Sequence, residues 1–149
     1  MTQANLERSL IIQPIEISPL QTKQKMSDDS RSFLIDVRSS MEFLFVGHPK
    51  GAISIPWIDE PDWDINPHFV RDIKQLILGG SCGDKDHQPP ILLICRSGKR
   101  SHEAGVKLIE AGILNVYNVA GGFEGERDEQ YQRSTVNGWR YDKLPWEQC

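Results

Sequence analysis

Cysteine is scarce in this chain, and its pattern argues against two common architectures. The 149 residues include 3 cysteines, Cys82, Cys95 and Cys149, which cannot all pair with one another. No CxxC pair occurs, and the 4 histidines are scattered along the sequence. We therefore expect neither a disulfide framework nor a structural metal site, and no cofactor.

Basic charge and long apolar runs are also in short supply. The net charge is −4, and the chain lacks the concentrated positive surface that nucleic acid requires. Its apolar runs are too short to span a bilayer, and the opening MTQANLERSL lacks the basic start and apolar centre of a secretory signal. We therefore expect a cytoplasmic protein that binds neither nucleic acid nor membrane, with residues 1–149 forming one domain.

Strand-like and helix-like patterns alternate along the sequence. We expect strands at 15–18, 33–37, 52–56, 91–95 and 115–119, and helices at about 19–26, 41–46, 67–77 and 99–111. The run ILLIC (91–95) is the most apolar and is typical of a central strand. This alternation predicts an α/β fold with a parallel sheet covered by helices on both faces, whose ligands bind beyond the carboxyl ends of the strands. The polar stretch 79–90 is expected to be a surface loop and the place where a dedicated partner would bind.

Three cations follow Cys95 within the sequence CRSGKR. Between the strand and the next helix the backbone has to curl, and Ser97 and Gly98 permit the dihedral angles that a curl needs. The N–H groups of such a curl and the N-terminus of the helix favour a thiolate, which is the nucleophilic form of cysteine. Arg96, Lys99 and Arg100 would surround a small dianion, so the sequence predicts a nucleophilic thiol at an anion site.

The alternative is that Cys95 is an ordinary core cysteine, which is a common fate for this residue type. A catalytic role requires its sulfur to be reachable from solvent, so a thiol sealed away from solvent would overturn the enzymatic prediction. We expect no catalytic role for Cys82, which lies in the polar loop, or for the terminal Cys149. His102, on the following helix, is expected to be solvated or structural.

At this point the residues resemble those of rhodanese-type sulfurtransferases. CRSGKRS (95–101) is similar to the active-site loop of that family, and LIDVRSSMEFLFVGHPKGAISIPW (34–57) is similar to its N-terminal signature. NVAGGFEG (118–125) and GWRYDKLPW (138–146) resemble later landmarks, so the likeness covers most of residues 15–146. It implies a single rhodanese domain with a central parallel five-stranded sheet.

The resemblance also implies a chemistry. Cys95 would take the outer sulfur of thiosulfate as a persulfide, release sulfite and pass the sulfur to cyanide or a thiol. The loop backbone over 96–100 would hold the persulfide, and the side chains of Arg96 and Arg100, with Lys99 as a third charge, would bind the sulfonate. Ser101 would support the loop. Asp36 and Arg38, which match the DVR of the signature, are expected to be mainly structural, with Asp36 bonded to loop N–H groups or to an arginine of the site.

Three other readings stay open. A Cys-dependent phosphatase or arsenate reductase would need a Cys-x5-Arg loop, whereas Cys95 to Arg100 is one residue shorter. A non-catalytic rhodanese-like binding module would normally lack the cysteine. A sulfur-relay enzyme would receive or deliver sulfur through a protein carrier. A fourth possibility is that 3-mercaptopyruvate is the sulfur donor. In the family, this specificity is found with loops that lack these cations.

Overall fold

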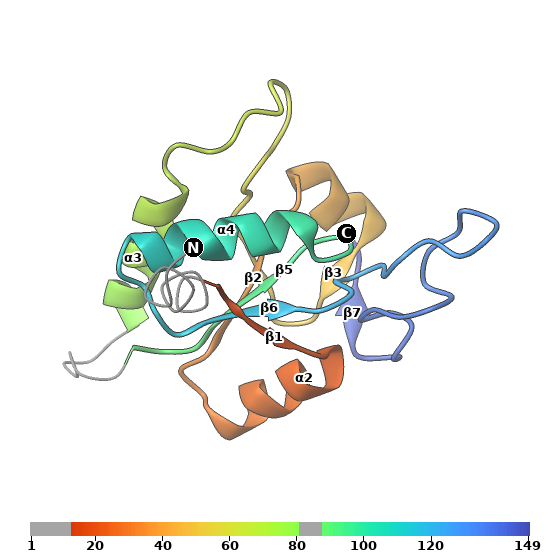
Figure 1. Ribbon diagram of the computed structural model, residues 1–149, viewed down its shortest axis with the longest axis horizontal. Coiled ribbons are helices and arrows are strands. Elements are labelled where there is room, and N and C mark those ends of the chain that lie inside the picture. Colours follow the sequence, from red (N-terminus) through yellow and green to blue (C-terminus); the bar gives the residue numbers. More distant parts are fainter. Residues whose placement is uncertain (1–12, 81–87) are drawn as a thin grey trace, which may run out of the picture.

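The computed structural model describes residues 13–80 and 88–149, which form a parallel sheet of five strands (Figure 1). Its strand order is β1 (Ile15–Ile17), β6 (Val116–Val119), β5 (Ile91–Ile94), β2 (Phe33–Asp36) and β4 (Ile53–Ser54). All four neighbouring pairs are parallel. The α/β class and the five-stranded parallel sheet expected from the sequence are thus confirmed, with strand ends shifted by one or two residues.

Helices cover both faces of the sheet, as expected. α2 (Pro19–Asp28) lies on one face, and α3 (Phe69–Gly80) and α4 (Lys99–Glu110) lie on the other (Figure 1). Two apolar cores fill the space between sheet and helices. The two longest described helices have 12 residues each, and no helix in the described part of the chain is long and apolar enough to cross a membrane.

The start of α2 follows directly from its sequence. Ser18 is the N-cap, and its hydroxyl accepts from the backbone N–H of Gln21 at 3.1 Å while the Gln21 side chain accepts from the N–H of Ser18 at 2.8 Å. Pro19 occupies the first helical position, where its missing N–H leaves no bond unmade. These local interactions explain why this helix could be placed from the sequence.

Two elements differ from expectation. The helix expected over 41–46 is a π-helix, η1 (Glu42–Val46), entered through hydrogen bonds between Ser39 and Glu42 at 3.2–3.3 Å. A two-stranded antiparallel sheet joins β3 (His48–Pro49) to β7 (Trp146–Glu147), and no local pattern in the sequence indicates it. In addition, α3 ends at Gly80 and so includes the first two residues of the loop expected over 79–90. Residues 81–87 of that expected loop lie outside the described residues.

The position of β5 determines where Cys95 lies. β5 is the middle strand, paired with β6 on one side and β2 on the other, and the side chains of Ile91 to Ile94 are 0% exposed. A strand buried on both faces needs the continuous apolar run that ILLI provides. Cys95 follows at its carboxyl end, the edge of a parallel sheet where ligands bind.

Candidate active site

The loop after β5 makes the turn that the sequence predicts. Gly98 is the N-cap of α4 in a left-handed conformation, with φ 111°, which residues with a side chain rarely adopt. The helix α4 therefore starts at Lys99, five residues after the last residue of β5. Its first turn faces the sulfur of Cys95.

The Sγ atom of Cys95 has two hydrogen-bond partners. The backbone N–H of Gly98 donates to it at 3.1 Å, and the hydroxyl of Ser101 lies 3.2 Å away. Both partners belong to the start of α4, Gly98 as its N-cap and Ser101 in its first turn. Ser101, expected only to support the loop, thus contacts the sulfur itself.

A buried asparagine fixes the surroundings of Ser101. The hydroxyl of Ser101 is also within hydrogen-bonding distance of Oδ1 of Asn118, while Nδ2 of Asn118 donates to Glu16 at 2.9 Å and to the carbonyl of Gly98 at 3.1 Å. Because these two bonds use the amide N–H groups, the amide oxygen faces Ser101. The single hydroxyl proton of Ser101 therefore goes either to Asn118 or to the sulfur.

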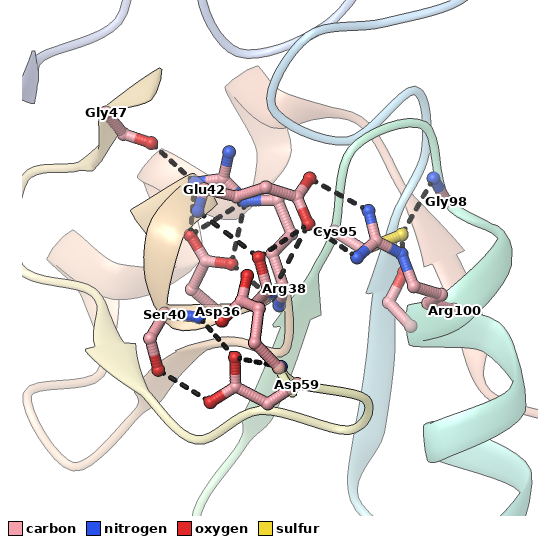
Figure 2. A network of polar contacts seen from close by, with 12 residues as sticks. Asp36, Arg38, Ser40, Glu42, Gly47, Asp59, Cys95, Gly98 and Arg100 are labelled. Carbon is pink, nitrogen blue, oxygen red and sulfur yellow. Dashed lines mark hydrogen bonds and ion pairs between the residues drawn. The ribbon is translucent and has the colours of Figure 1, made fainter. Parts of the chain in front are cut away.

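Cys95 is more deeply buried than a reactive thiol was expected to be. Only 1% of the residue is exposed, and it packs at the edge of the larger apolar core. Burial alone is what an ordinary core cysteine would show. The difference lies in the hydrogen bond that the N–H of Gly98 donates to its sulfur and in the guanidinium of Arg100, which lies between the sulfur and Glu42 (Figure 2).

Arg100 is held in a bidentate ion pair with Glu42. Its Nη1 and Nη2 atoms lie 2.7 and 3.0 Å from the two carboxylate oxygens, and the side chains are 23% and 21% exposed (Figure 2). The hydrogen bond to Glu42 raises the pKa of Arg100. Burial pushes the pKa of Glu42 up, but the bonds and charge of Arg100 outweigh it and hold that pKa below its ordinary value. Glu42, expected only to cap a helix, therefore neutralises a cation of the loop.

The three loop cations do not line one site. Arg96 and Arg100 line an open hollow of about 640 Å³, together with apolar side chains of η1 and with Trp63. Ser97, Gly98 and Lys99 line a second hollow of about 390 Å³ on another side of the loop. His102 also lines the second hollow, where its Nδ1 lies 3.5 Å from Glu16.

Asp36 and Arg38 form a buried ion pair at the carboxyl end of β2, the strand next to β5. Both side chains are 0% exposed, and Nη2 of Arg38 lies 2.6 Å from the carboxylate of Asp36 and also donates to the carbonyl of Gly47 (Figure 2). Asp36 thus binds Arg38 rather than the loop N–H groups or a loop arginine. This arrangement joins the end of β2 to the turn before β3.

Hydrogen bonds to Asp59 hold the loop that carries Glu60 and Trp63, two residues that line the large hollow. The carboxylate of Asp59 accepts from the backbone N–H and hydroxyl of Ser40 at 2.9 and 2.7 Å and from the N–H of Glu60 at 2.9 Å (Figure 2). Burial raises the pKa of Asp59, but the hydrogen bonds from Glu60 and Ser40 outweigh burial and lower it to about 2. These hydrogen bonds fix the loop that carries Trp63.

The segment after β6 supports the loop from the other side. The N–H of Phe123 donates to the carbonyl of Cys95 at 2.8 Å, and those of Glu124 and Gly125 donate to the carbonyl of Arg96 at 3.0 and 3.2 Å. Gly122 approaches so closely that a Cβ atom there would lie 2.4 Å from the carbonyl oxygen of Cys95. Only glycine fits this contact.

Three residues of the site were not identified from the sequence. Asn118 gave a weak signal, as a polar residue inside the expected apolar strand 115–119. Glu42 was assigned a local capping role only. Arg133, which lines the large hollow, lies in a polar stretch without any motif and gave no signal.

Among the described residues, no second cysteine lines either hollow beside the loop. Cys149 is exposed at the end of the chain, and Cys82 lies outside the described residues. Within 13–80 and 88–149, no three His, Cys, Asp or Glu side chains come together as a metal-binding group.

The fold and the loop define an α/β domain centred on one cysteine at the end of its middle parallel strand. The sequence matches the family described as "Rhodanese-like domain" over residues 18–129. The chain therefore belongs to the rhodanese-like domain family.

Individual relatives agree with this assignment. The chain is 30% identical over 110 residues to the thiosulfate sulfurtransferase GlpE of Haemophilus influenzae, covering 74% of this chain and 85% of that protein. It is 32% identical over 128 residues to an uncharacterized protein of Rickettsia rickettsii, covering 82% and 87%. Its structure is similar to the crystal structure of Rv0390 from M. tuberculosis, with a TM-score of 0.75 and 34% identity over 90% of this chain and 97% of that one.

Proposed function

We propose that this protein is a thiosulfate sulfurtransferase that carries the transferred sulfur as a persulfide on Cys95. The observation that carries the proposal is the hydrogen bond from Gly98 N–H to Cys95 Sγ, made at the N-terminus of α4. It occurs in a chain of the rhodanese-like family that is similar to a protein named thiosulfate sulfurtransferase.

The first half-reaction is a displacement at sulfur. The thiolate of Cys95 attacks the outer sulfur of thiosulfate, so that a new bond forms from Sγ to this sulfur. The original sulfur–sulfur bond breaks, and its electron pair leaves with sulfite. The N–H of Gly98 and the N-terminus of α4 stabilise the negative charge on Cys95 before the attack and on the persulfide after it. In this scheme Cys95 reacts as the thiolate, and no separate general base takes part.

The second half-reaction returns the cysteine to its resting form. A thiolate or cyanide attacks the outer sulfur of the persulfide, and the electron pair of the broken bond goes back to Sγ. No electrons are gained or lost overall. This sequence predicts ping-pong kinetics.

Binding of the donor uncovers the sulfur. In the resting structure Arg100 is paired with Glu42 and lies beside a sulfur that is almost wholly buried. The sulfonate of thiosulfate offers a guanidinium the same two-oxygen geometry as a carboxylate. We infer that the donor takes the place of Glu42 on Arg100 and that the resulting movement opens access to Cys95, while the exposed Arg96 adds a second charge.

Intact-mass analysis after incubation with thiosulfate tests the proposal. The protein should gain one sulfur atom, which cyanide removes as thiocyanate, and Cys95→Ala should gain none. Cys149→Ala is the matched control, because Cys149 is the exposed thiol of the described chain and should not be needed. Absence of the gain, together with hydrolysis of p-nitrophenyl phosphate, would instead favour a phosphatase; absence of both would favour a binding module in which Cys95 is a core residue.

A further inference from the structure

A third guanidinium reaches the large hollow beside the Cys95 loop from far along the chain. Arg133 lines this hollow together with Arg96 and Arg100. It lies beyond residue 129, where the match to the family ends.

Backbone hydrogen bonds fix Arg133 relative to the loop. Its Nη1 donates to the carbonyl of Gly125 at 2.7 Å, and the N–H of Gly125 donates to the carbonyl of Arg96 at 3.2 Å. The N–H of Ser134 donates to the carbonyl of Glu124 at 2.6 Å, which closes the segment on itself. The guanidinium is thus held in place before any ligand arrives, so little order is lost on binding.

The charge of this guanidinium is not balanced in the way that Glu42 balances Arg100. Within 13–80 and 88–149, neither Arg96 nor Arg133 forms an ion pair. Burial, followed by the like charge of Arg96, lowers the pKa of Arg133. An anion bound between the two guanidinium groups would relieve this repulsion.

The rest of the wall is partly acidic and partly apolar. Glu42, Glu60 and Glu124 line it, and two of them are already paired, Glu42 with Arg100 and Glu124 with Arg140. Met41, Phe45 and Trp63 line it, and they are 55%, 63% and 56% exposed. The hollow of about 640 Å³ falls within the range of about 300–1,000 Å³ typical of sites for organic ligands, and a small inorganic dianion would fill only part of it. Its apolar side chains, together with the two guanidinium groups that have no ion pair in the described residues, suit a molecule with both an anionic group and an apolar part.

We propose that Arg133, together with Arg96, selects the sulfur acceptor by binding the carboxylate of an organic thiol whose hydrocarbon part lies against Met41, Phe45 and Trp63. This inference rests on the persulfide chemistry proposed above and adds the class of acceptor. The acceptor thiolate attacks the outer sulfur of the Cys95 persulfide and leaves as a persulfide itself, while Sγ keeps the electron pair. Arg133 is a binding residue in this step and does not touch the reacting sulfur.

The test uses protein loaded with sulfur and freed of donor, so that only the second half-reaction is observed. Three small thiols of different charge serve as acceptors: 3-mercaptopropionate, 2-mercaptoethanol and cysteamine. We expect Arg133→Ala to lower the second-order rate constant for 3-mercaptopropionate by about tenfold or more, since a charge-assisted hydrogen bond of about 1.5–3 kcal/mol is lost. The constant for neutral 2-mercaptoethanol should stay within about twofold and that for cysteamine should rise.

Two variants control for other effects. Arg133→Lys keeps the charge without the fork of donors and should retain part of the preference for 3-mercaptopropionate. Arg127→Ala removes a cation from the same segment, one that packs over Tyr131 and does not line the hollow, and should leave the preference intact. An unchanged preference in Arg133→Ala, or an equal loss for all three thiols, would overturn the inference.

A binding measurement separates this inference from the proposed function. 3-(Methylthio)propionate has the carboxylate but no free thiol, and its binding to unloaded protein can be followed by NMR. Weaker binding to Arg133→Ala than to the wild type supports the site even if no persulfide forms. Equal binding to both proteins overturns it even if Cys95 is loaded by thiosulfate.

Discussion

The ion pair between Glu42 and Arg100 leads to a prediction whose sign is informative. Glutamine at position 42 can still accept from the N–H and hydroxyl of Ser39, because glutamine serves as well as glutamate in a capping box. Glu42→Gln therefore removes the charge that holds Arg100 and keeps the entry into η1. If the donor has to replace Glu42 on Arg100, this variant should react with thiosulfate faster than the wild type.

The size of the effect follows from the geometry and exposure of the pair. Two charge-assisted bonds at 2.7 and 3.0 Å would contribute more in a buried site, but the side chains are 23% and 21% exposed, so solvent screens them in part. A contribution of about 1–2 kcal/mol to holding Arg100 in place corresponds to an increase of about five- to thirtyfold in kcat/KM for thiosulfate.

Steady-state kinetics with thiosulfate and cyanide provide the assay. Glu124→Gln is the control: Glu124 lines the same hollow, but its partner is Arg140 at 3.3 Å. It should reproduce the general effect of removing a negative charge near an anion site, without freeing Arg100. The difference between the two variants measures the release of Arg100.

Two results would refute this reasoning. Equal changes in Glu42→Gln and Glu124→Gln would mean that release of Arg100 plays no part. A lower kcat/KM in Glu42→Gln would mean that Glu42 holds Arg100 in the geometry that the donor needs, so that the pair belongs to the site and is not displaced.

Three further predictions concern stability. Asp36→Asn leaves Arg38 buried without a counter-ion and should lower the free energy of unfolding by about 3–5 kcal/mol, measured by urea denaturation. A loss below about 1 kcal/mol would contradict the buried ion pair. Because the pKa of Asp59 is lowered to about 2, its ionised carboxylate stabilises the fold at pH values above about 4. This stabilisation should be lost as the pH falls from about 4 towards about 2. In Asp59→Asn, the stability measured over the same pH range should not show this loss. Gly122→Ala places a Cβ atom 2.4 Å from a backbone oxygen and should lower the free energy of unfolding by more than about 2 kcal/mol. Gly112→Ala is the control: its Cβ would have no atom within 4 Å, so only the penalty of about 1 kcal/mol for the positive φ is expected. Equal losses of stability in thermal unfolding would refute the close approach at Gly122.

The local elements of this protein could be read from the sequence because short-range interactions decide them. The capping bonds between Ser18 and Gln21 span three residues, the run ILLI is apolar throughout, and Gly98 allows the turn after Cys95. The order of strand and helix patterns then implied the parallel sheet, and the fold class was predicted correctly for that reason. The same local features placed Cys95 at the carboxyl end of a strand, shortly before the N-terminus of a helix.

What the sequence could not determine is which distant groups meet at that cysteine. The pair of Glu42 and Arg100 joins residues 58 apart, and Arg133 reaches the hollow from a segment with no recognisable motif. The burial of Cys95 and the separation of Lys99 from Arg96 also depend on how the loop packs against other segments. Caps and turns are decided by bonds within a few residues, but the surroundings of a side chain are decided by the packing of the whole domain. The sequence by itself therefore determined the position of Cys95 and the turn that follows it, and only the tertiary structure determined which charges remain available to a ligand.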